Sequence, residues 1–395
     1  MDKKIYISLF VLYAILQLVS TNSDHEKRNV TKNVYDVKCG NISHKLVHIK
    51  STSKSNLENE IHYLISTINL PTIVVKHVLK KTTVTINNDN ICNRNGEAFT
   101  FSDNNKELSG VIITRIFSYN DSSDTVSLKK ASKIGPNIIS HYEWLLSNSP
   151  DNSDKSVMTL FSGTTHNSSS QLTLMTKTYS ETYRSTDLPH DSVNENVTEF
   201  RLTLNKLYAE KYLRYAVEVT FFSTNNSEDS GKYKTFKSID DEYTPGIFKY
   251  WTITFPISTF ASWKPVAYNS EVFSRQTQSL LYQFDDSGNE LSSKGKLNSK
   301  SYIDWSIVAG IPSIMFYSTN VTFGVSKDGW YQETNYSSWT GMVGVGEPPT
   351  DSVSTKVYII ISICLGSPIV LMLVGIFTLL IRQVKFGRNN YKAIN

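Results

Sequence analysis

The sequence predicts an all-β ectodomain, built as sheet packed on sheet in a β-sandwich-like fold of two halves, followed by one C-terminal transmembrane α-helix. Apolar and polar residues alternate in short runs such as Phe200–Leu204 and Tyr215–Phe221, as they do in half-buried strands. Polar turn signals such as Asn87–Asn90 and Asp285–Gly288 separate these runs,. A charge-free stretch of 25 residues, Val357–Ile381, stands near the C-terminus. Together they indicate strands followed by a membrane span.

The N-terminus has the pattern of a secretory signal peptide at residues 1–23. Two lysines precede the largely apolar stretch Ile5–Val19, and the small residues Ser20–Ser23 follow it. Such a stretch is short for a membrane span, although an uncleaved anchor is the alternative. Residues 24–356 are therefore predicted to be luminal.

The luminal part contains two cysteines, Cys39 and Cys92, because the third, Cys364, falls within the predicted membrane helix. In an oxidising lumen these two permit a single disulfide. The sequence leaves open whether they are bonded or are two free thiols. Stability has to come from an ordinary apolar core.

Further strands are expected along the luminal chain at Val111–Ile113, buried on both faces, at Trp251–Phe255 and at Asn320–Phe323,. The best helical candidates, Leu57–Ile65 and Leu204–Leu213, are short and ambiguous. An internal domain boundary is possible near residues 190–235, where the composition turns polar.

The last luminal segment, Gly341–Pro349, allows two interpretations. Its glycines permit close backbone approach, and Pro348 and Pro349 stop a strand,. It is either a last strand with a stiff linker, or a stalk that fixes the angle of the ectodomain over the membrane.

The predicted span at residues 357–381 would form a helix of about 37 Å, enough to cross a hydrocarbon core of about 30 Å. The tail, residues 382–395, carries four basic groups and no acidic side chain, which predicts a cytoplasmic C-terminus and type I orientation. Ser362 and Gly366 are four residues apart, as in a face that packs against another helix; ordinary tolerance of small residues is the alternative. Tyr391 and Ile394 form a Tyr-x-x-bulky signal of the kind that sorting adaptors read.

Composition and motifs indicate neither nucleic-acid binding nor a cofactor. The net charge of +4 arises in the signal and tail regions, so the luminal part has no basic face for nucleic acid. The acidic cluster Ser238–Tyr243 suits a calcium or acid–base site, or a polar turn. The eight histidines are scattered, without the spacing of a metal site. We expect a protein with no catalytic, metal or cofactor residues.

Asn-x-Ser/Thr sequons are abundant in the luminal part, although chance alone would give roughly seven in a chain of this composition. A luminal chain with these sites is expected to be glycosylated at several of them, and glycans shield the backbone from proteases. The sequons stand at Asn29, Asn41, Asn120, Asn167, Asn196, Asn225, Asn320 and Asn335.

The second half of the chain resembles the glycosylated lysosomal membrane protein family. The resemblance runs from about residue 236 to the end and is thinner earlier, around LVHIK (46–50) and IHYLIST (61–67). The motifs that carry it are SIDDEYTPGIF (238–248), FASWKPVAY (260–268), NVTFG (320–324), YSSWTGMVGVGEPPTD (336–351), GSP (366–368) and the terminal YKAIN.

This resemblance implies a single-pass type I glycoprotein of the lysosomal membrane with an all-β luminal part and no enzymatic activity. It implies an accessory subunit that stabilises a lysosomal major-facilitator transporter, a small-peptide exporter, and shields it from luminal proteases. Tyr391 and Ile394 would then carry lysosomal sorting through adaptors, and Asn320 occupies the place of a family sequon. The chain departs from the family in having no cysteine between Cys92 and Cys364.

Two alternatives remain from the sequence. A luminal hydrolase would show a converging polar pocket that contains Asp240, Asp241 or a histidine. A cell-surface receptor or adhesion glycoprotein would have no need of Tyr391.

Overall fold

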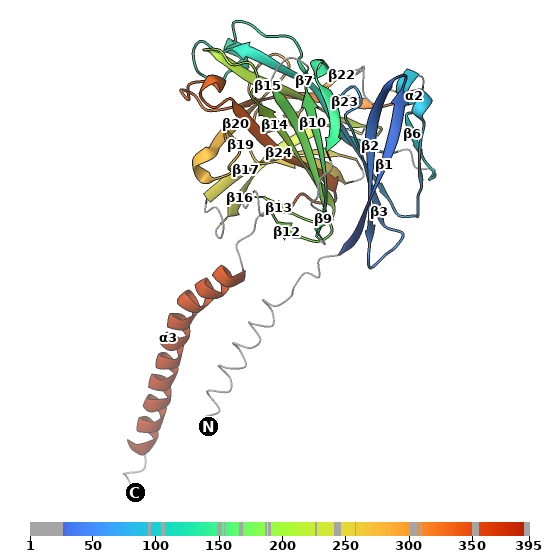
Figure 1. Ribbon diagram of the computed structural model, residues 1–395. Coiled ribbons are helices and arrows are strands. Elements are labelled where there is room, and N and C mark those ends of the chain that lie inside the picture. The colour runs from blue at the N-terminus through green and yellow to red at the C-terminus, as the bar shows by residue number, and fades with distance from the viewer. Residues whose placement is uncertain are drawn as a thin grey trace. The chain divides into compact units, whose positions relative to one another are not determined.

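The computed structural model falls into two compact units, a β unit of residues 24–238 and 247–350 and a second unit that contains the C-terminal helix. The predicted signal peptide lies outside the described residues (Figure 1). The structure describes residues 27–93, 96–103, 107–147, 152–153, 155–165, 169–185, 188, 191–225, 227–240, 246–256, 258–300, 307–308, 310–349 and 355–390.

The first sheet of the β unit is antiparallel and runs in the order β1–β2–β3–β4–β7–β15–β23. Short β22 and β20 both pair with the free side of β23. The strands are β1 Arg28–Cys39, β2 Ile42–Ser53, β3 Glu60–Ser66, β4 Thr72–Val78, β7 Ser109–Asn120, β15 Leu213–Ser223, β20 Gln278–Phe284, β22 Asn298–Lys300 and β23 Met315–Phe323.

The second sheet runs β8–β10–β11–β14–β24–β18–β17 and is also antiparallel. Strand β19 pairs with both β24 and β20, so that β20 joins the two sheets. The strands are β8 Glu143–Ser147, β10 Ser156–Thr164, β11 Gln171–Tyr179, β14 Val197–Asn205, β17 Gly246–Phe255, β18 Thr259–Trp263, β19 Val266–Tyr268 and β24 Tyr336–Val345.

Smaller elements complete the β unit. β9 pairs with β10, β16 with β21, β12 with β13, and β5 with β6. Their bounds are β5 Val84–Ile86, β6 Phe99–Phe101, β9 Asn152–Ser153, β12 Tyr183–Arg184, β13 Ser192–Val193, β16 Lys232–Asp240 and β21 Lys294–Lys296, with the helix α2 Asn88–Asn93 and the 3₁₀ turns η1 Leu128–Lys130, η2 Ile139–His141, η3 Arg275–Thr277 and η4 Tyr331–Glu333.

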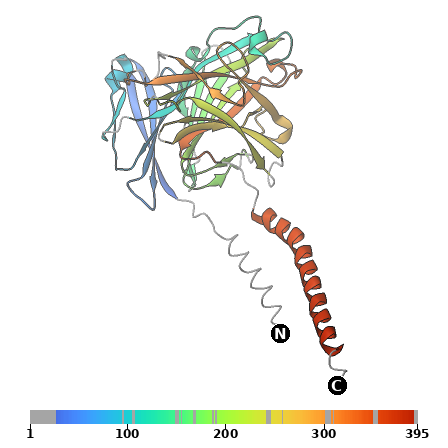
Figure 2. The ribbon, with the colours of Figure 1, turned by 180° about the vertical axis from the view of Figure 1, so that it is seen from behind.

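The two sheets face each other (Figures 1 and 2), and the largest apolar cluster includes residues of both sheets and a series of aromatic rings. Phe221 of β15 stacks on Trp263 of β18 at 5.7 Å between ring centroids. Trp263 meets Trp339 of β24 edge-on at 5.7 Å, and Trp339 meets Phe200 of β14 at 5.4 Å. Large buried rings dominate core energetics. The sheet-on-sheet prediction is therefore confirmed.

The alternation of apolar and polar residues correctly predicted the positions of several strands. Phe200–Leu204 lies in β14, Tyr215–Phe221 in β15 and Asn320–Phe323 in β23. Val111–Ile113 lies in β7 and is buried at all three positions, as predicted for a strand with both faces covered. The stretch near residues 190–235, left open as a boundary, is spanned by pairings of β15 with β7 and β23 within one compact unit.

Both helical candidates are wrong. Leu57–Ile65 contributes a turn and most of β3, whose seven residues are all buried. Leu204–Leu213 comprises the end of β14, a loop and the first residue of β15. Short apolar runs do not distinguish a buried strand from a helix, and here pairing with neighbouring strands decides.

The segment Gly341–Val345 is a strand rather than a stalk. It forms half of β24, in which all ten positions are buried. A Cβ on Gly341 would approach the ring of Phe200 to 2.6 Å, so the absence of a side chain lets the facing ring pack here,. A linker to the helix begins only at Gly346, where φ is +88°.

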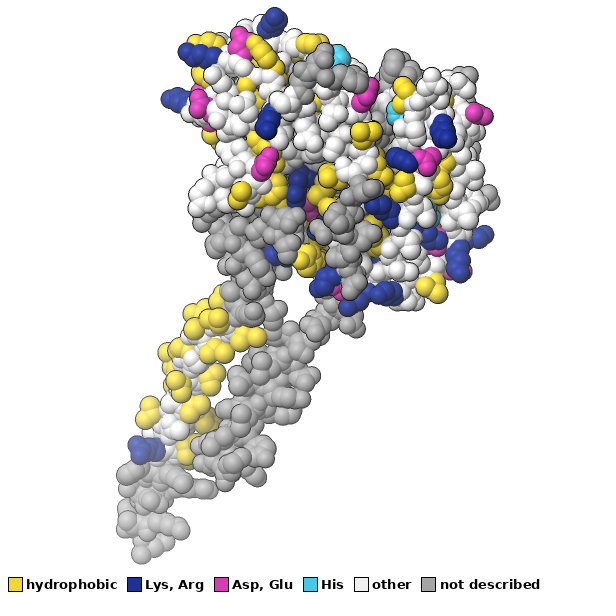
Figure 3. Space-filling view, in the orientation of Figure 1, with side chains coloured by type: hydrophobic (Ala, Val, Ile, Leu, Met, Phe, Trp, Pro, Cys, Tyr) yellow, Lys and Arg dark blue, Asp and Glu magenta, His cyan; other side chains and the backbone are white. Residues whose placement is uncertain are grey.

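The helix α3 spans Thr355–Asn390, so it extends beyond both ends of the predicted 357–381. Within it, Ile359–Val384 is long and apolar enough to cross a membrane, and the part of the chain that the structure describes buries none of it. Figure 3 shows hydrophobic side chains along this helix. The prediction of one C-terminal transmembrane helix is confirmed.

Candidate functional site

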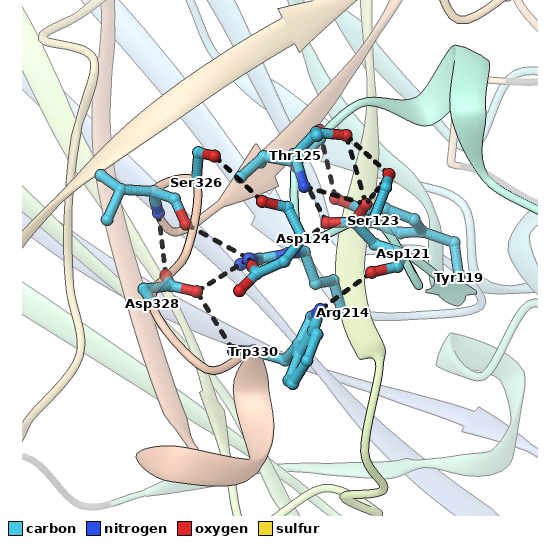
Figure 4. Close-up of polar contacts among 11 residues, drawn as sticks. Tyr119, Asp121, Ser123, Asp124, Thr125, Arg214, Ser326, Asp328 and Trp330 are labelled. Atoms are coloured by element: carbon cyan, nitrogen blue, oxygen red, sulfur yellow. Dashed lines mark hydrogen bonds and ion pairs between the residues drawn. The ribbon is translucent and has the colours of Figure 1, made fainter.

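The most elaborate polar cluster surrounds Arg214 of β15 (Figure 4). The arginine is 2% exposed and meets three carboxylates. Its Nε donates to Oδ2 of Asp121 at 2.8 Å, and one Nη donates to Oδ1 of Asp328 at 2.8 Å. The same nitrogen also donates to Asp124. Asp121 and Asp124 lie in the turn after β7, and Asp328 lies in the turn after β23.

Backbone amides donate further hydrogen bonds to two of these carboxylates, Asp121 and Asp328. Asp121 accepts from the amides of Thr125 at 3.1 Å and Val126 at 2.8 Å. Asp328 accepts from the amides of Val325 at 2.8 Å and Trp330 at 3.1 Å. These bonds hold the carboxylates of Asp121 and Asp328 in fixed positions.

Charge pairing keeps Arg214 ionised. Burial acts to lower the pKa of Arg214, but hydrogen bonds and charge from Asp328 and Asp121 outweigh it and raise that pKa,. The indole Nε1 of Trp330 closes the cluster with a bond to the carbonyl of Asp121 at 2.9 Å. We therefore assign the Arg214 cluster the role of joining two loops to β15.

A small cavity adjoins this cluster. Its walls combine Arg214 and Asp328 with aromatic rings, notably those of Tyr268, Trp330 and Tyr331. Its volume is about 50 Å³, whereas pockets for small molecules measure roughly 300–1,000 Å³. The cavity has room for water rather than for a metabolite.

A second polar cluster pairs two histidines across β2 and β3. Nε2 of His48 lies 2.9 Å from Nδ1 of His62, and the two rings are parallel with their centroids 5.2 Å apart. Nε2 of His62 lies 3.2 Å from Glu60 Oε2, whose other oxygen meets Lys50 Nζ at 2.6 Å. Because His62 Nε2 donates to Glu60, its Nδ1 accepts and His48 Nε2 is the donor. His48 Nδ1 is left buried without a partner.

Burial lowers the pKa of His48 and of His62 to about 4. For His48 the charge of His62 adds to this effect, and for His62 the carboxylate of Glu60 opposes it. The side chains of His62 and Glu60 are 0% and 1% exposed. A general base has to reach its substrate, so this buried cluster is not an open catalytic site.

The other residues of the hydrolase alternative cannot be placed. Asp241 lies outside the described residues, and of Asp240 only the backbone, at the end of β16, is described. Among the residues that the structure describes, no group of three His, Cys, Asp or Glu side chains is arranged to hold a metal ion.

The sequons differ in how much of the asparagine is accessible. Asn29, Asn41 and Asn335 are exposed, and Asn120, Asn196 and Asn225 are half-buried. Asn320 in β23 is 7% exposed, and its Nδ2 donates to the carbonyl of Asp285 at 3.3 Å. Asn167 lies outside the described residues. Transfer of a glycan needs a free amide, so the first three are the best placed.

Cys39 and Cys92 are joined by a disulfide, with their Cα atoms 5.2 Å apart. The bond ties α2 to the end of β1, across 53 residues of sequence. The disulfide therefore fastens α2 to the β1–β2 hairpin.

The membrane helix presents the predicted small residues. Ser362 is exposed and Gly366 is partly exposed, with nothing within 4 Å of a Cβ placed on the glycine. Pro368 lies inside the helix. Tyr391 and Ile394 lie outside the described residues.

Sequence reasoning missed both buried clusters. The signal for the first was the pair Asp121 and Asp124 directly after a strand, together with Asp328 before Gly329; nothing in the sequence pointed to Arg214 as their partner. The two histidines are 14 residues apart, and only the register of β2 on β3 brings them together.

Comparison with known proteins points to one family. A sequence model described as "Glycosylated lysosomal membrane protein" matches residues 45–385. The chain is 25% identical to "Glycosylated lysosomal membrane protein B" of Xenopus laevis, over 96% of each chain. It is 26% identical to the Danio rerio protein over 73% of this chain and 71% of that one, and 31% identical to the Homo sapiens protein over 40% and 37%.

A solved galactose 1-epimerase from Lactobacillus acidophilus NCFM covers 81% of this chain and 100% of its own, at 8% identity and a TM-score of 0.34. A likeness this distant says nothing about activity.

Proposed function

The chain belongs to the glycosylated lysosomal membrane protein family, and from this premise we propose that it is the accessory subunit of a polytopic lysosomal transporter. In this proposal the β unit is luminal, the tail after Arg382 is cytoplasmic, and the partner is a small-peptide exporter of the major facilitator superfamily. The chain stabilises this partner and shields its luminal loops from proteolysis.

One observation carries the proposal: an unburied apolar helix is joined to a β unit whose two polar clusters, around Arg214 and around His48 and His62, consist of side chains that bind one another. Among the described residues, none buries the span Ile359–Val384. A single span with a small-residue step between Ser362 and Gly366 suits contact with other membrane helices. The β unit itself offers the Arg214 and His48–His62 clusters, and both are closed.

Shielding requires a domain that resists the proteases it excludes. Cleavage follows the population of locally opened backbone. In the β unit most of the chain is tied into antiparallel ladders around one core, and the disulfide fastens α2 to β1. Glycans at exposed positions such as Asn41 and Asn335 would protect turns that the ladders leave open.

The test is capture of the full chain from native lysosomal membranes with a tag at its C-terminus, followed by mass spectrometry. We expect one major-facilitator transporter as the dominant partner, with a half-life that shortens when this chain is depleted and recovers with inhibitors of luminal proteases. A half-life that does not respond to the inhibitors would contradict shielding. Capture of adhesion or receptor ligands in place of a transporter would favour the cell-surface alternative.

A further inference from the structure

Arg28 brings three segments together at one end of the β unit. Its Nε donates to Oδ1 of Asn196 at 2.9 Å, and one Nη donates to Oδ1 of Asn59 at 2.8 Å. The backbone carbonyl of Asn196 accepts from the amide of Val345 at 3.1 Å. The start of β1, the turn between β2 and β3 and the end of β24 therefore meet here. We call this the exit end, because the chain leaves the β unit at Gly346 on its way to α3.

Two exposed leucines stand at the exit end. Leu57, in the turn between β2 and β3, is 61% exposed, and Leu79, directly after β4, is 67% exposed. They belong to the same end because Val78 pairs with Glu60. Neither leucine is buried in the core, although Leu57 stands just before β3 and Leu79 directly after β4, two strands that are almost fully buried.

Positive charge surrounds these leucines. Among the described residues, the five exposed lysines of the exit end outnumber its carboxylates, of which Glu60 and Asp103 are largely buried and Glu58 and Glu181 are more accessible; Figure 3 shows dark blue side chains gathered along this edge. Glu181 pairs with two of the lysines, at 3.1 and 3.0 Å. The other three exposed lysines, Lys54, Lys80 and Lys81, form no ion pair with a described residue. The lysines are Lys27 and Lys155, which hold Glu181, and Lys54, Lys80 and Lys81.

Exposed aliphatic side chains ringed by lysines are the pattern of proteins that rest on a membrane surface. The apolar tips enter the boundary between headgroups and acyl chains, and the ammonium groups meet lipid phosphates. We propose that the exit end docks on anionic lipid headgroups, with Leu57 and Leu79 inserted and Lys54, Lys80 and Lys81 in contact with phosphate. This contact does not depend on the transporter partner.

The position of the chain exit favours lipid over an acidic protein as the occupant. β24 ends at the exit end and its chain continues to the membrane helix. The exposed sequons Asn41 and Asn335 lie at the far ends of β1 and β24, away from the exit end. Asn29, on β1, is the exposed sequon beside it.

The full chain, reconstituted in vesicles, provides the test. Spin labels are attached to Leu57→Cys and Leu79→Cys in a Cys364→Ser background, with Tyr208→Cys as the matched control. Tyr208 is 70% exposed, and its neighbour Lys206 bonds to Asn335 at the opposite end of β24. Accessibility to oxygen and to a water-soluble nickel chelate is compared between neutral phosphatidylcholine vesicles and vesicles with added anionic phospholipid.

We expect labels 57 and 79, but not 208, to gain oxygen and lose nickel accessibility several-fold in anionic vesicles. Substitution of Lys54, Lys80 and Lys81 by Glu should abolish this gain while the unfolding midpoint stays unchanged. The proposal would be overturned if labels 57 and 79 were as accessible to water as label 208. Equal shielding of labels 57 and 79 in neutral and in anionic vesicles would also overturn it. So would shielding that disappears when the protein is diluted in the bilayer, because that result would mean that a second copy of the chain covers the two labels.

Discussion

Arg214 and Asp121 are 93 residues apart in the sequence, yet the guanidinium Nε donates to the carboxylate at 2.8 Å with the arginine almost fully buried. Asp124 and Asp328 complete the set around the same guanidinium. One cation therefore neutralises part of the charge of three carboxylates at the loops that follow β7 and β23. Stability of this end of the β unit should depend on it.

Replacement of Arg214 by Met should destabilise the β unit by about 3–5 kcal/mol, because it leaves the buried carboxylate of Asp121 without its cation,. The measurement is the free energy of unfolding from denaturant titration of the purified chain. Lys327→Met, in the same loop as Asp328 but exposed, is the matched control and should change stability by less than about 0.5 kcal/mol. Equal effects from both variants would mean that the cluster contributes nothing specific.

The fold could be predicted from the sequence where the local pattern of apolar and polar residues reflects which side chains are buried. Val111–Ile113 reads as a strand with both faces covered, and β7 is such a strand. Leu204–Leu213 was not predictable in this way, since its conformation follows from the pairing of β14 with β24 and of β15 with β7. The Arg214 cluster and the His48–His62 pair depend on contacts between strands, which periodicity does not encode. Sequons, by contrast, are readable from the sequence, but their accessibility is not.

The two buried histidines should make the β unit less stable in acid. In the folded chain the pKa of His48 and of His62 is lowered to about 4, while in the unfolded chain both titrate near their ordinary value of about 6.5. The unfolded state therefore binds more protons between these values, and stability falls as the pH drops through this window. The loss for the pair should be on the order of a few kcal/mol.

His48→Phe tests this expectation, since it keeps a flat ring beside His62 and removes one titrating group. Unfolding free energy is measured from about pH 6.5 down to about pH 4, where the variant should show a shallower decline than the native chain. His141→Phe is the control, because His141 is exposed in η2. A decline that His48→Phe leaves unaltered would assign acid sensitivity to other groups.

Occupancy of the sequons should follow the accessibility of their amides. We expect glycans at Asn29, Asn41 and Asn335, and none at Asn320, whose Nδ2 is bonded to the carbonyl of Asp285 inside the sheet. Enzymatic deglycosylation in heavy-oxygen water followed by peptide mass spectrometry reads each site. A fully occupied Asn320 would require that β23 leave its place beside β20, which would refute the register found here.

Tyr391 should direct the chain to lysosomes if the terminal Tyr-x-x-Ile signal is read by sorting adaptors. Tyr391→Ala is expected to move the steady-state pool toward the cell surface, measured by surface biotinylation and by colocalisation with lysosomal markers. Tyr391→Phe keeps the ring, and separates the need for an aromatic side chain from the need for the hydroxyl. Unchanged colocalisation of the Ala variant would show that the tail is not the sorting determinant, or that a partner's own signal dominates.

Shielding by the β unit should depend on the short connection between β24 and α3. Because Gly341–Val345 belongs to the core strand, the linker starts at Gly346 and includes Pro348 and Pro349. A flexible Gly-Ser insertion of about fifteen residues after Pro349 would extend the reach of the β unit by tens of ångströms and lower its effective concentration over a neighbour's loops. Folding and sorting should be intact, and the partner's half-life in pulse-chase should shorten.

The control for this insertion is a helical insert of equal length built from Glu-Ala-Ala-Ala-Lys repeats, which adds length with less flexibility. If the β unit protects by covering loops close to the membrane, both inserts should shorten the partner's half-life, the flexible one less severely because it still lets the unit return to the loops. If protection comes from contact along the Ser362–Gly366 face of α3, neither insert should matter, whereas Gly366→Leu should, because a large side chain keeps a second helix from close approach. Equal half-lives for the native chain and both insertions would therefore exclude covering as the mechanism and assign protection to the membrane helix or to assisted folding.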